Sequence, residues 1–507
     1  MGRDHWMDED KSLVYSALLL VVASSVAVLW FLKRRGPPVP PGPCGVPLLG
    51  FLPWIDPKAP HLTFTRLAKH YGPIYSLKLG NVFTVVLSDP HLIRQAFAKD
   101  IFVGRAPLYL THGIMKGNGL ICAEGELWKD QRKFVTVCLR NFGMIKFGSK
   151  RERLEKRILV GVQECLEMLG RNSNAVEPLP IILHCIGNVM NSLVFGVSYA
   201  ENDPMWKWLQ QLQDEGLKYI GVTGILNFLP ILRFIPKFKK PMNFLMEGKM
   251  KSHEYYHTII LDRMKKRKSF PGDDENYLAD NIIDSFLDEK ERRGEGDKGF
   301  YNTTQFHHLL GDMFGAGLDT TMTTLRWFVL FMAANSGAQK RVQAELDSVV
   351  GSRLPTLEDL PLLPYTEAAL AETQRIRSVV PVGIPHGALA ATTFAGYHIP
   401  KGTMIMPLQW AVHMDPNQWP EPERFSPERF LTTEGQFNRP ESFIPFQTGK
   451  RMCVGEELAR MMLFLFGSAI IQKFNITAPD NIDIDLEGEC GFTLAPKPQK
   501  LIFIPRV

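Results

Sequence analysis

The chain has 507 residues, of which 45% are hydrophobic and 22% charged, a globular composition that argues against disorder, collagen-like repeats and a multi-span membrane protein. Its 58 Lys and Arg residues against 53 Asp and Glu residues leave a net charge of +5, too small to predict a nucleic-acid partner. Seven scattered cysteines argue against a disulfide framework or a zinc knuckle and favour a reducing compartment.

The first predicted element is a membrane anchor. Residues 13–32 are uncharged and mostly apolar, and a helix of this length spans about 30 Å, the thickness of a bilayer core. Three basic residues follow it, whereas residues 1–12 are mainly acidic, which predicts a luminal N-terminus and a cytosolic body. A buried core helix is the alternative. Residues 33–47 are basic and then proline-rich, which predicts a stiff hinge before a body spanning residues 48–507.

The body begins with a predicted β-hairpin and continues with mostly helical spacing. Residues 74–79 and 82–87 are two β-type runs joined by a Gly-Asn turn. Residues 225–238 are apolar with two basic residues interspersed, which predicts either a second contact with the membrane interface or a core-packing loop and helix. Residues 288–298 hold nine charges in eleven positions and predict a solvated linker.

A long apolar helix is predicted from about residue 305 to residue 335, and it carries polar groups that need partners. Asp319 and Thr320 lie within it, where a hydroxyl can both donate and accept and a carboxyl can relay protons. A threonine bonded back to its own helix is the alternative. Three glycines between positions 311 and 317 each destabilise a helix by about 1 kcal/mol relative to alanine, which indicates close approach of a flat ligand.

Two later patterns are informative, the first as a weak structural signal and the second for chemistry. Glu372 and Arg375 form E-x-x-R, which places both side chains on one face of a helix. Cys453 lies in a glycine-punctuated loop before a helical run from Glu456, where backbone N–H groups and the helix N-terminus predict a lowered thiol pKa. A lone thiolate suits a metal whose other ligands come from a macrocycle better than it suits zinc. A buried inert thiol is the alternative.

The loop around this cysteine resembles the haem-binding loop of the cytochrome P450 family. Its pattern F-x-x-G-x-R-x-C-x-G falls on Phe446, Gly449, Arg451, Cys453 and Gly455. Further motifs occur in the order that the family has, namely W-x-x-x-R, A-G-x-D-T-T, E-x-x-R and F-x-P-E-R-F. The sequence is therefore identified as a member of this family. That implies a mainly α fold with minor β, in a single large P450-type haem domain behind an N-terminal transmembrane helix.

The resemblance implies a haem b cofactor and assigns roles to individual residues. Cys453 would be the metal ligand, as the axial ligand of the haem iron. Asp319 and Thr320 would be catalytic, because they deliver protons on the side of the haem where oxygen binds. Arg429 would join Glu372 and Arg375 in a buried charge network. The residues that would bind the haem are Cys453, Arg451, Arg132, Trp128, His386, Arg105, Phe446 and Gly449, with a solvated surface charge as the alternative for Arg105.

The resemblance also implies where electrons come from. The sequence carries no flavin or nicotinamide fingerprint, so a separate protein must supply them. A microsomal member of the family implies an endoplasmic reticulum membrane location and NADPH–cytochrome P450 reductase as partner, with NADPH used indirectly. Candidates for a cationic docking face, with solvated surface charge as the equal alternative, are Lys129, Lys133, Arg140 and Lys450.

A finer resemblance concerns the substrate. Residues 104–119, 127–132 and 142–144 are similar to the steroid-hormone hydroxylases of insects. This implies a lipophilic steroid substrate and hydroxylation at C-25 of an ecdysteroid precursor in moulting-hormone biosynthesis. By the same resemblance the pocket would be lined by residues 108–119, Met313, residues 380–384 and residues 492–494, for which ordinary core packing is the alternative.

Other functions stay open at this point. One is hydroxylation at C-26 of an ecdysteroid, and another is a broad-specificity xenobiotic or fatty-acid hydroxylase of the same fold. A third is a haem-thiolate isomerase, or a haem-binding carrier or sensor, that uses no oxygen. The pair Asp319 and Thr320 speaks against this third class, because such proteins do not need to deliver protons to dioxygen.

Overall fold

The computed structural model describes residues 37–171, 174–220, 224–269 and 279–506, together with Val21 and Ser24. The anchor predicted at residues 13–32 lies almost entirely outside these residues. Within the part of the chain that is described, no helix is long and apolar enough to cross a membrane.

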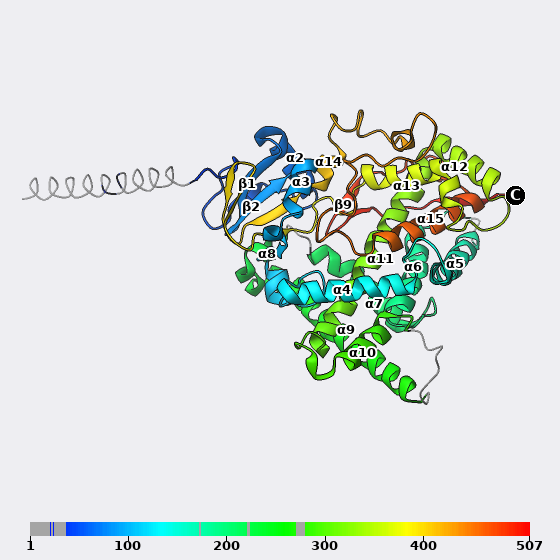
Figure 1. Ribbon diagram of the computed structural model, residues 1–507. Coiled ribbons are helices and arrows are strands. Elements are labelled where there is room, and N and C mark those ends of the chain that lie inside the picture. The colour runs from blue at the N-terminus through cyan, green and yellow to red at the C-terminus, as the bar shows by residue number, and fades with distance from the viewer. Residues whose placement is uncertain are drawn as a thin grey trace, which may run out of the picture.

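The body is mainly helical, with a small sheet at one side and α11 running through the middle (Figure 1). The helices are α2 (Pro60–Tyr71), α3 (Pro90–Phe97), α4 (Gly125–Phe142), α5 (Ser149–Gly170), α6 (Pro178–Val194), α7 (Pro204–Ile220), α8 (Ile225–Phe228), α9 (Pro236–Ser269), α10 (Ile282–Arg293), α11 (Thr303–Ala334), α12 (Ser336–Val349), α13 (Pro364–Ile376), α14 (Gln409–His413) and α15 (Glu456–Lys473).

The strands are short and fall into four sheets. They are β1 (Ile74–Leu79), β2 (Val82–Leu87), β3 (Gly104–Arg105), β4 (His386–Gly387), β5 (Thr392–Phe394), β6 (Tyr397–Ile399), β7 (Met404–Pro407), β8 (Phe474–Thr477), β9 (Gly488–Cys490), β10 (Leu494–Pro496) and β11 (Ile502–Pro505). The largest sheet has the order β1-β2-β7-β4-β3. The hairpin predicted from the sequence is confirmed as β1 and β2, with the predicted bounds.

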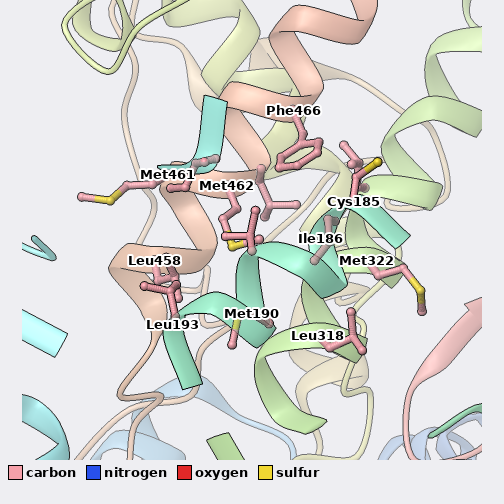
Figure 2. Packing of buried hydrophobic residues seen from close by; sticks show 14 of the residues in the cluster. Cys185, Ile186, Met190, Leu193, Leu318, Met322, Leu458, Met461, Met462 and Phe466 are labelled. Carbon is pink, nitrogen blue, oxygen red and sulfur yellow. The ribbon is translucent and has the colours of Figure 1, made fainter. Parts of the chain in front are cut away.

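The main core lies between α6, α11 and α15. Met190 of α6, Leu318 of α11 and Met462 of α15 belong to one buried cluster (Figure 2), and each is at most 2% exposed. Full burial of such a side chain contributes roughly 1.5–3 kcal/mol. The long apolar helix predicted at residues 305–335 is confirmed as α11, and the side chain of Asn302 caps it by accepting a hydrogen bond from the N–H of Gln305 at 2.9 Å.

The largest sheet brings together two residues that are far apart in the sequence. Strands β3 and β4 pair antiparallel, with Arg105 opposite His386. Strand β7 holds β4 in place, because it pairs antiparallel with β4 and parallel with β2. The sheet thus fixes two of the predicted haem-binding residues side by side.

The predicted solvated linker at residues 288–298 is wrong for its first half. Residues 288–293 are the last turns of α10, and Arg293 forms a salt bridge with Asp130 of α4 at 2.8 Å. The dense charges of this segment pair with one another and with α4, so the charge run stabilises a helix end instead of keeping the chain in solvent. Residues 294–296 continue as one short 3-10 turn.

Candidate active site

The cysteine loop is held by its own backbone and by α3. The N–H of Cys453 donates to the carbonyl of Phe446 at 3.0 Å, which closes the loop. Gly449 has a φ of +79°, and a Cβ there would lie 2.3 Å from the carbonyl oxygen of Phe97, the last residue of α3. Any larger residue at 449 would therefore push the loop away from α3.

A loop hydrogen bond of the kind expected to lower the pKa of Cys453 is present, but it does not outweigh burial. Although the side chain is solvent-accessible, the protein atoms around it raise the pKa of the thiol to about 11. A hydrogen bond from the backbone N–H of Gly455 and the charge of Arg132 lower the pKa, but by less. Metal coordination deprotonates a thiol outright. Binding to iron would therefore form the thiolate of Cys453, and the loop would only orient it.

Two guanidiniums meet above this loop, held by backbone carbonyls. Arg105 donates from Nε to the carbonyl of Ile121 at 2.6 Å. Arg451 donates to the carbonyls of Val103 and Ala123, both at 2.6 Å, and more weakly to that of Ile121 at 3.4 Å. Both side chains are buried. Burial, with repulsion from Arg132, lowers the pKa of Arg105 to about 10. Burial, with repulsion from Arg105 and Arg132, lowers the pKa of Arg451 to about 8.

Helix α4 adds Trp128 and Arg132, one turn apart. The guanidinium of Arg451 lies over the ring of Trp128, with 4.4 Å between Cζ and the ring centroid. Arg132 donates to the carbonyl of Met452 at 2.8 Å, directly beside Cys453. The W-x-x-x-R spacing therefore brings one residue to the pair of guanidiniums and the other to the cysteine loop.

His386 completes the group from the sheet. Its ring stacks on Phe97, with centroids 3.7 Å apart, and its Nδ1 donates to the carbonyl of Phe102 at 2.8 Å. Burial lowers the pKa of His386 well below its ordinary value, so the ring is neutral. Its Nε2 has no hydrogen-bond partner among the described residues, although the ring is only 1% exposed.

These observations fit a haem. Three guanidiniums, those of Arg105, Arg132 and Arg451, form no ion pair with a carboxylate within the described part of the chain. Repulsion between these guanidiniums is relieved by an anionic, hydrogen-bond-accepting ligand, whereas the unpaired Nε2 of the neutral His386 ring is an acceptor and needs a hydrogen-bond donor. Two propionates on an iron macrocycle supply such a ligand, and Cys453 supplies a sulfur donor beside it.

Of the predicted proton-delivery pair, Thr320 lies on a partly open face of α11 and Asp319 is buried beside it. Met313, Ala316 and Thr320 recur at helical spacing and are partly or fully accessible, whereas most of the helix is buried. The hydroxyl of Thr320 donates to the carbonyl of Ala316 at 2.8 Å. Asp319 is buried and accepts a hydrogen bond from the hydroxyl of Thr493 at 2.9 Å. The back-bonded conformation leaves the lone pairs of Thr320 available to a donor in the open space.

One of the three α11 glycines has a use that needs no ligand. A Cβ at Gly317 would lie 2.3 Å from Cε of Met190 on α6, so this glycine lets α6 approach α11 closely. At Gly311 and Gly315 a Cβ would make only ordinary contacts, and a surface for a flat ligand stays a prediction there. The sequence pattern cannot distinguish the two uses, because either requires a position without a side chain.

Several groups around the site were not evident in the sequence. The carbonyls of Val103, Ile121 and Ala123 hold the guanidiniums, and a backbone acceptor leaves no mark in residue type. Thr493 was expected only as part of a pocket-lining turn, and the structure makes it the partner of Asp319. Of the predicted docking cations, Lys450 pairs with Asp100 at 2.5 Å.

The charge network predicted around E-x-x-R is confirmed. Glu372 and Arg375 are fully buried and form a bidentate pair at 2.7 and 2.8 Å. Arg429 reaches the same carboxylate at 3.3 Å, and the N–H of Ser426 donates to it at 2.9 Å. The network ties α13 to the segment that leads into the cysteine loop.

Residues 40–503 match the family model described as Cytochrome P450. The chain belongs to the cytochrome P450 family and is a cytochrome P450 monooxygenase, and the family implies a haem-thiolate cofactor.

Individual relatives share nearly the full length. The chain is similar to Cytochrome P450 306a1 of Drosophila melanogaster, with 42% identity over 99% of this chain and 96% of that protein. Identity to Cytochrome P450 18a1 of Drosophila melanogaster is 36%, over 97% of this chain and 92% of the relative. Identity to Cytochrome P450 2J2 of Homo sapiens is 34%, over 97% of this chain and 96% of that protein.

Proposed function

We propose that this monooxygenase hydroxylates a lipophilic steroid, specifically C-25 of an ecdysteroid precursor in moulting-hormone biosynthesis. The observation that carries the proposal is the similarity of residues 104–119 to insect steroid-hormone hydroxylases. The 42% identity with a cytochrome P450 of an insect over 99% of the chain supports it.

In this proposal each residue of the site has one task. Cys453 would ligate the iron, and Arg105, Arg132, Arg451, Trp128 and His386 would hold the propionates, while Phe446 and Gly449 would keep the shape of the cysteine loop. A haem bound there would supply the activation of oxygen. One oxygen atom enters a substrate C–H bond to form the alcohol, and the other leaves as water after taking up electrons and protons.

The protons come through α11. The carboxyl of Asp319 is buried and bonded to Thr493, while the hydroxyl of Thr320 faces the partly open side of the helix. Asp319 and Thr320 are therefore the proposed catalytic residues: Asp319 passes a proton inward from solvent, and Thr320 presents it at the reacting oxygen.

The proposed substrate pocket lies between α11 and the loop at residues 108–119. Part of this loop, Tyr109–Ile114, forms a single wide helical turn, and its N–H at Leu110 donates to the side chain of Asn227. Met313 lies on the accessible face of α11. Residues 380–384 and 492–494 complete the proposed lining, with the carbonyl of Val379 accepting from the N–H of Leu494 at 2.8 Å.

The proposed location is the endoplasmic reticulum membrane, with residues 13–32 as anchor, residues 1–12 luminal and the body at residues 48–507 cytosolic behind the hinge at residues 33–47. A second contact with the membrane is proposed at residues 225–238. Ile231 and Phe234 there are 72% and 70% exposed and lie beside Arg233, a combination typical of interfacial segments.

The proposed electron donor is NADPH–cytochrome P450 reductase, so NADPH is used indirectly. Lys129, Lys133 and Arg140 lie on α4, the helix that also carries Arg132 beside the cysteine loop. This placement supports a cationic docking face on the side of the molecule from which electrons would reach the haem.

The test is reconstitution of the full chain with haem, reductase and NADPH, followed by mass spectrometry of the products from a panel of ecdysteroid precursors. The proposal expects an added oxygen at C-25 of a precursor that still lacks that hydroxyl group. An oxygen at C-26 would support the other insect hydroxylase activity. Faster turnover of fatty acids or xenobiotics than of any ecdysteroid would overturn the substrate assignment.

A further inference from the structure

Two side chains of α11 outside the catalytic pair fix the backbone of a distant segment. Gln305 is 1% exposed, its Oε1 accepts from the N–H of Gly119 at 2.9 Å, and its Nε2 donates to the carbonyl of Gly119 at 2.9 Å. Two turns later, Oδ2 of Asp312 accepts from the N–H of Leu120 at 2.7 Å and that of Ile121 at 2.8 Å. Four backbone groups of three consecutive residues are thus held by one helix.

The backbone of this segment is shaped for that contact. Gly119 has a φ of +82°, and a Cβ there would lie 2.2 Å from Oδ2 of Asp312. Lys116 and Gly117 also have positive φ, so the chain turns sharply before it reaches the clamped residues. The contacts of Gln305 and Asp312 with residues 119–121, which we call the clamp, therefore lie between the proposed substrate loop and the segment that follows.

The segment that follows holds the guanidiniums. The carbonyl of Ile121 accepts from Arg105 at 2.6 Å and from Arg451 at 3.4 Å, and the carbonyl of Ala123 accepts from Arg451 at 2.6 Å. Because the N–H and the carbonyl of Ile121 belong to the same short piece of chain, Asp312 sets where that carbonyl points.

We propose that Gln305 and Asp312 are positioning residues for the haem. They fix residues 119–121, and through the carbonyls of Ile121 and Ala123 they aim Arg105 and Arg451 at the propionates. Buried N–H groups without acceptors are strongly unfavourable, so the segment moves when either side chain is lost. The inference rests on the proposed role of the two arginines.

The chain offers a matched control. Gln339 of α12 is 2% exposed and clamps one residue in the same way, since its Oε1 accepts from the N–H of Ile476 at 2.7 Å and its Nε2 donates to the carbonyl of Ile476 at 2.9 Å. Gln339→Leu therefore removes an equivalent buried clamp that touches none of the proposed haem-binding residues.

The experiment measures haem transfer from the full-length holoprotein to excess apomyoglobin, with hydrogen exchange of residues 119–121 as a second readout. Gln305→Leu and Asp312→Leu are expected to speed haem release about tenfold and to expose these amides. Asp312→Asn keeps an acceptor oxygen and is expected to release haem within about twofold of the parent chain. Gln339→Leu is expected to lower the melting temperature without speeding haem release.

Non-additivity provides the sharper criterion. If the clamp acts through the arginines, Gln305→Leu adds nothing to haem release once Arg105→Leu and Arg451→Leu are present. Equal release by Gln305→Leu and Gln339→Leu would overturn the inference, as would fully additive effects. If the arginine variants alone left haem release unchanged, their proposed role would fail instead. Should Asp312→Leu not fold, Gln305→Leu and Asp312→Asn carry the test.

Discussion

Arg451 occupies a position that lysine cannot replace. Its guanidinium donates to the carbonyls of Val103 and Ala123 while its flat face lies over Trp128. A lysine ammonium is a point charge without a planar face, so it cannot make these contacts together. The sequence motif marks the arginine, and the structure shows the backbone carbonyls that hold it.

Arg451→Lys is therefore expected to behave much like a deletion of the side chain. Each buried carbonyl left without a donor costs about 1–3 kcal/mol. The expected result is a lower urea midpoint and faster haem release than in the parent chain, measured on the holoprotein. Parental values for both would show that the carbonyl contacts are dispensable.

Thr320→Ala tests proton delivery. The variant removes a hydroxyl on the accessible face of α11 without removing a buried contact, so the chain is expected to fold and to retain haem. Product formed per NADPH consumed is expected to fall several-fold, because reduced oxygen leaves as peroxide or water. Oxygen uptake and product are measured together, and an unchanged ratio would remove Thr320 from the proposed mechanism.

The buried carboxyl of Asp312 predicts how the stability of the folded chain depends on pH. Burial raises the pKa of its carboxyl from 3.8 to about 6. The folded chain then binds the proton more tightly than the unfolded chain, so this group makes stability fall as pH rises from about 4 to about 6. The difference of about two pKa units corresponds to ~3 kcal/mol. Urea midpoints of Asp312→Asn are expected to vary less over this range than those of the parent chain, and equal slopes would contradict the assignment.

At the level of helices and strands, sequence reasoning located what periodicity and strong motifs encode. Strands β1 and β2 and helix α11 follow from alternation and from a long apolar run, and Glu372 and Arg375 share a face because they are three residues apart. The pairing of Arg105 with His386 did not follow, because strands of two residues carry no periodic signal. The backbone carbonyls that hold Arg105 and Arg451 could not be predicted either, because a backbone acceptor leaves no mark in residue type.

The buried pair on α13 should matter far more than a similar pair on the surface. Glu372→Gln leaves Arg375 and Arg429 in the interior without their carboxylate, a change expected to cost about 3–5 kcal/mol. Arg424 and Glu421 have the same i,i+3 spacing but are 70% and 72% exposed, so Arg424→Gln is the matched control with a near-zero effect. Urea unfolding of both variants measures the difference, and equal losses would contradict the argument.

At the level of the whole molecule, three of the exposed apolar residues lie where the chain is proposed to face a bilayer. Trp54, Ile231 and Phe234 are all more than half exposed, and each lies outside the cores of the described body. Water does not favour such side chains, whereas the headgroup region of a membrane accommodates them.

The double variant Ile231→Ser with Phe234→Ser is expected to weaken binding to phospholipid vesicles. The measurement is flotation of a chain that begins at residue 37, so that the proposed anchor does not dominate. Phe147→Ser is the control, because Phe147 is 86% exposed at the turn between α4 and α5, away from residues 225–238. Equal flotation of the double variant and the parent would place the membrane contact elsewhere.

The proposed haem-binding residues are spread from Arg105 in β3 to Cys453 just before α15, and the pairing of β3 with β4 joins parts of this site that lie more than half of the chain apart. With the site proposed here, a nascent polypeptide cannot capture its cofactor until almost all of it has left the ribosome. Cells short of haem would accumulate chains that are translated to full length but unloaded, and the supply of porphyrin would then set the abundance of working enzyme.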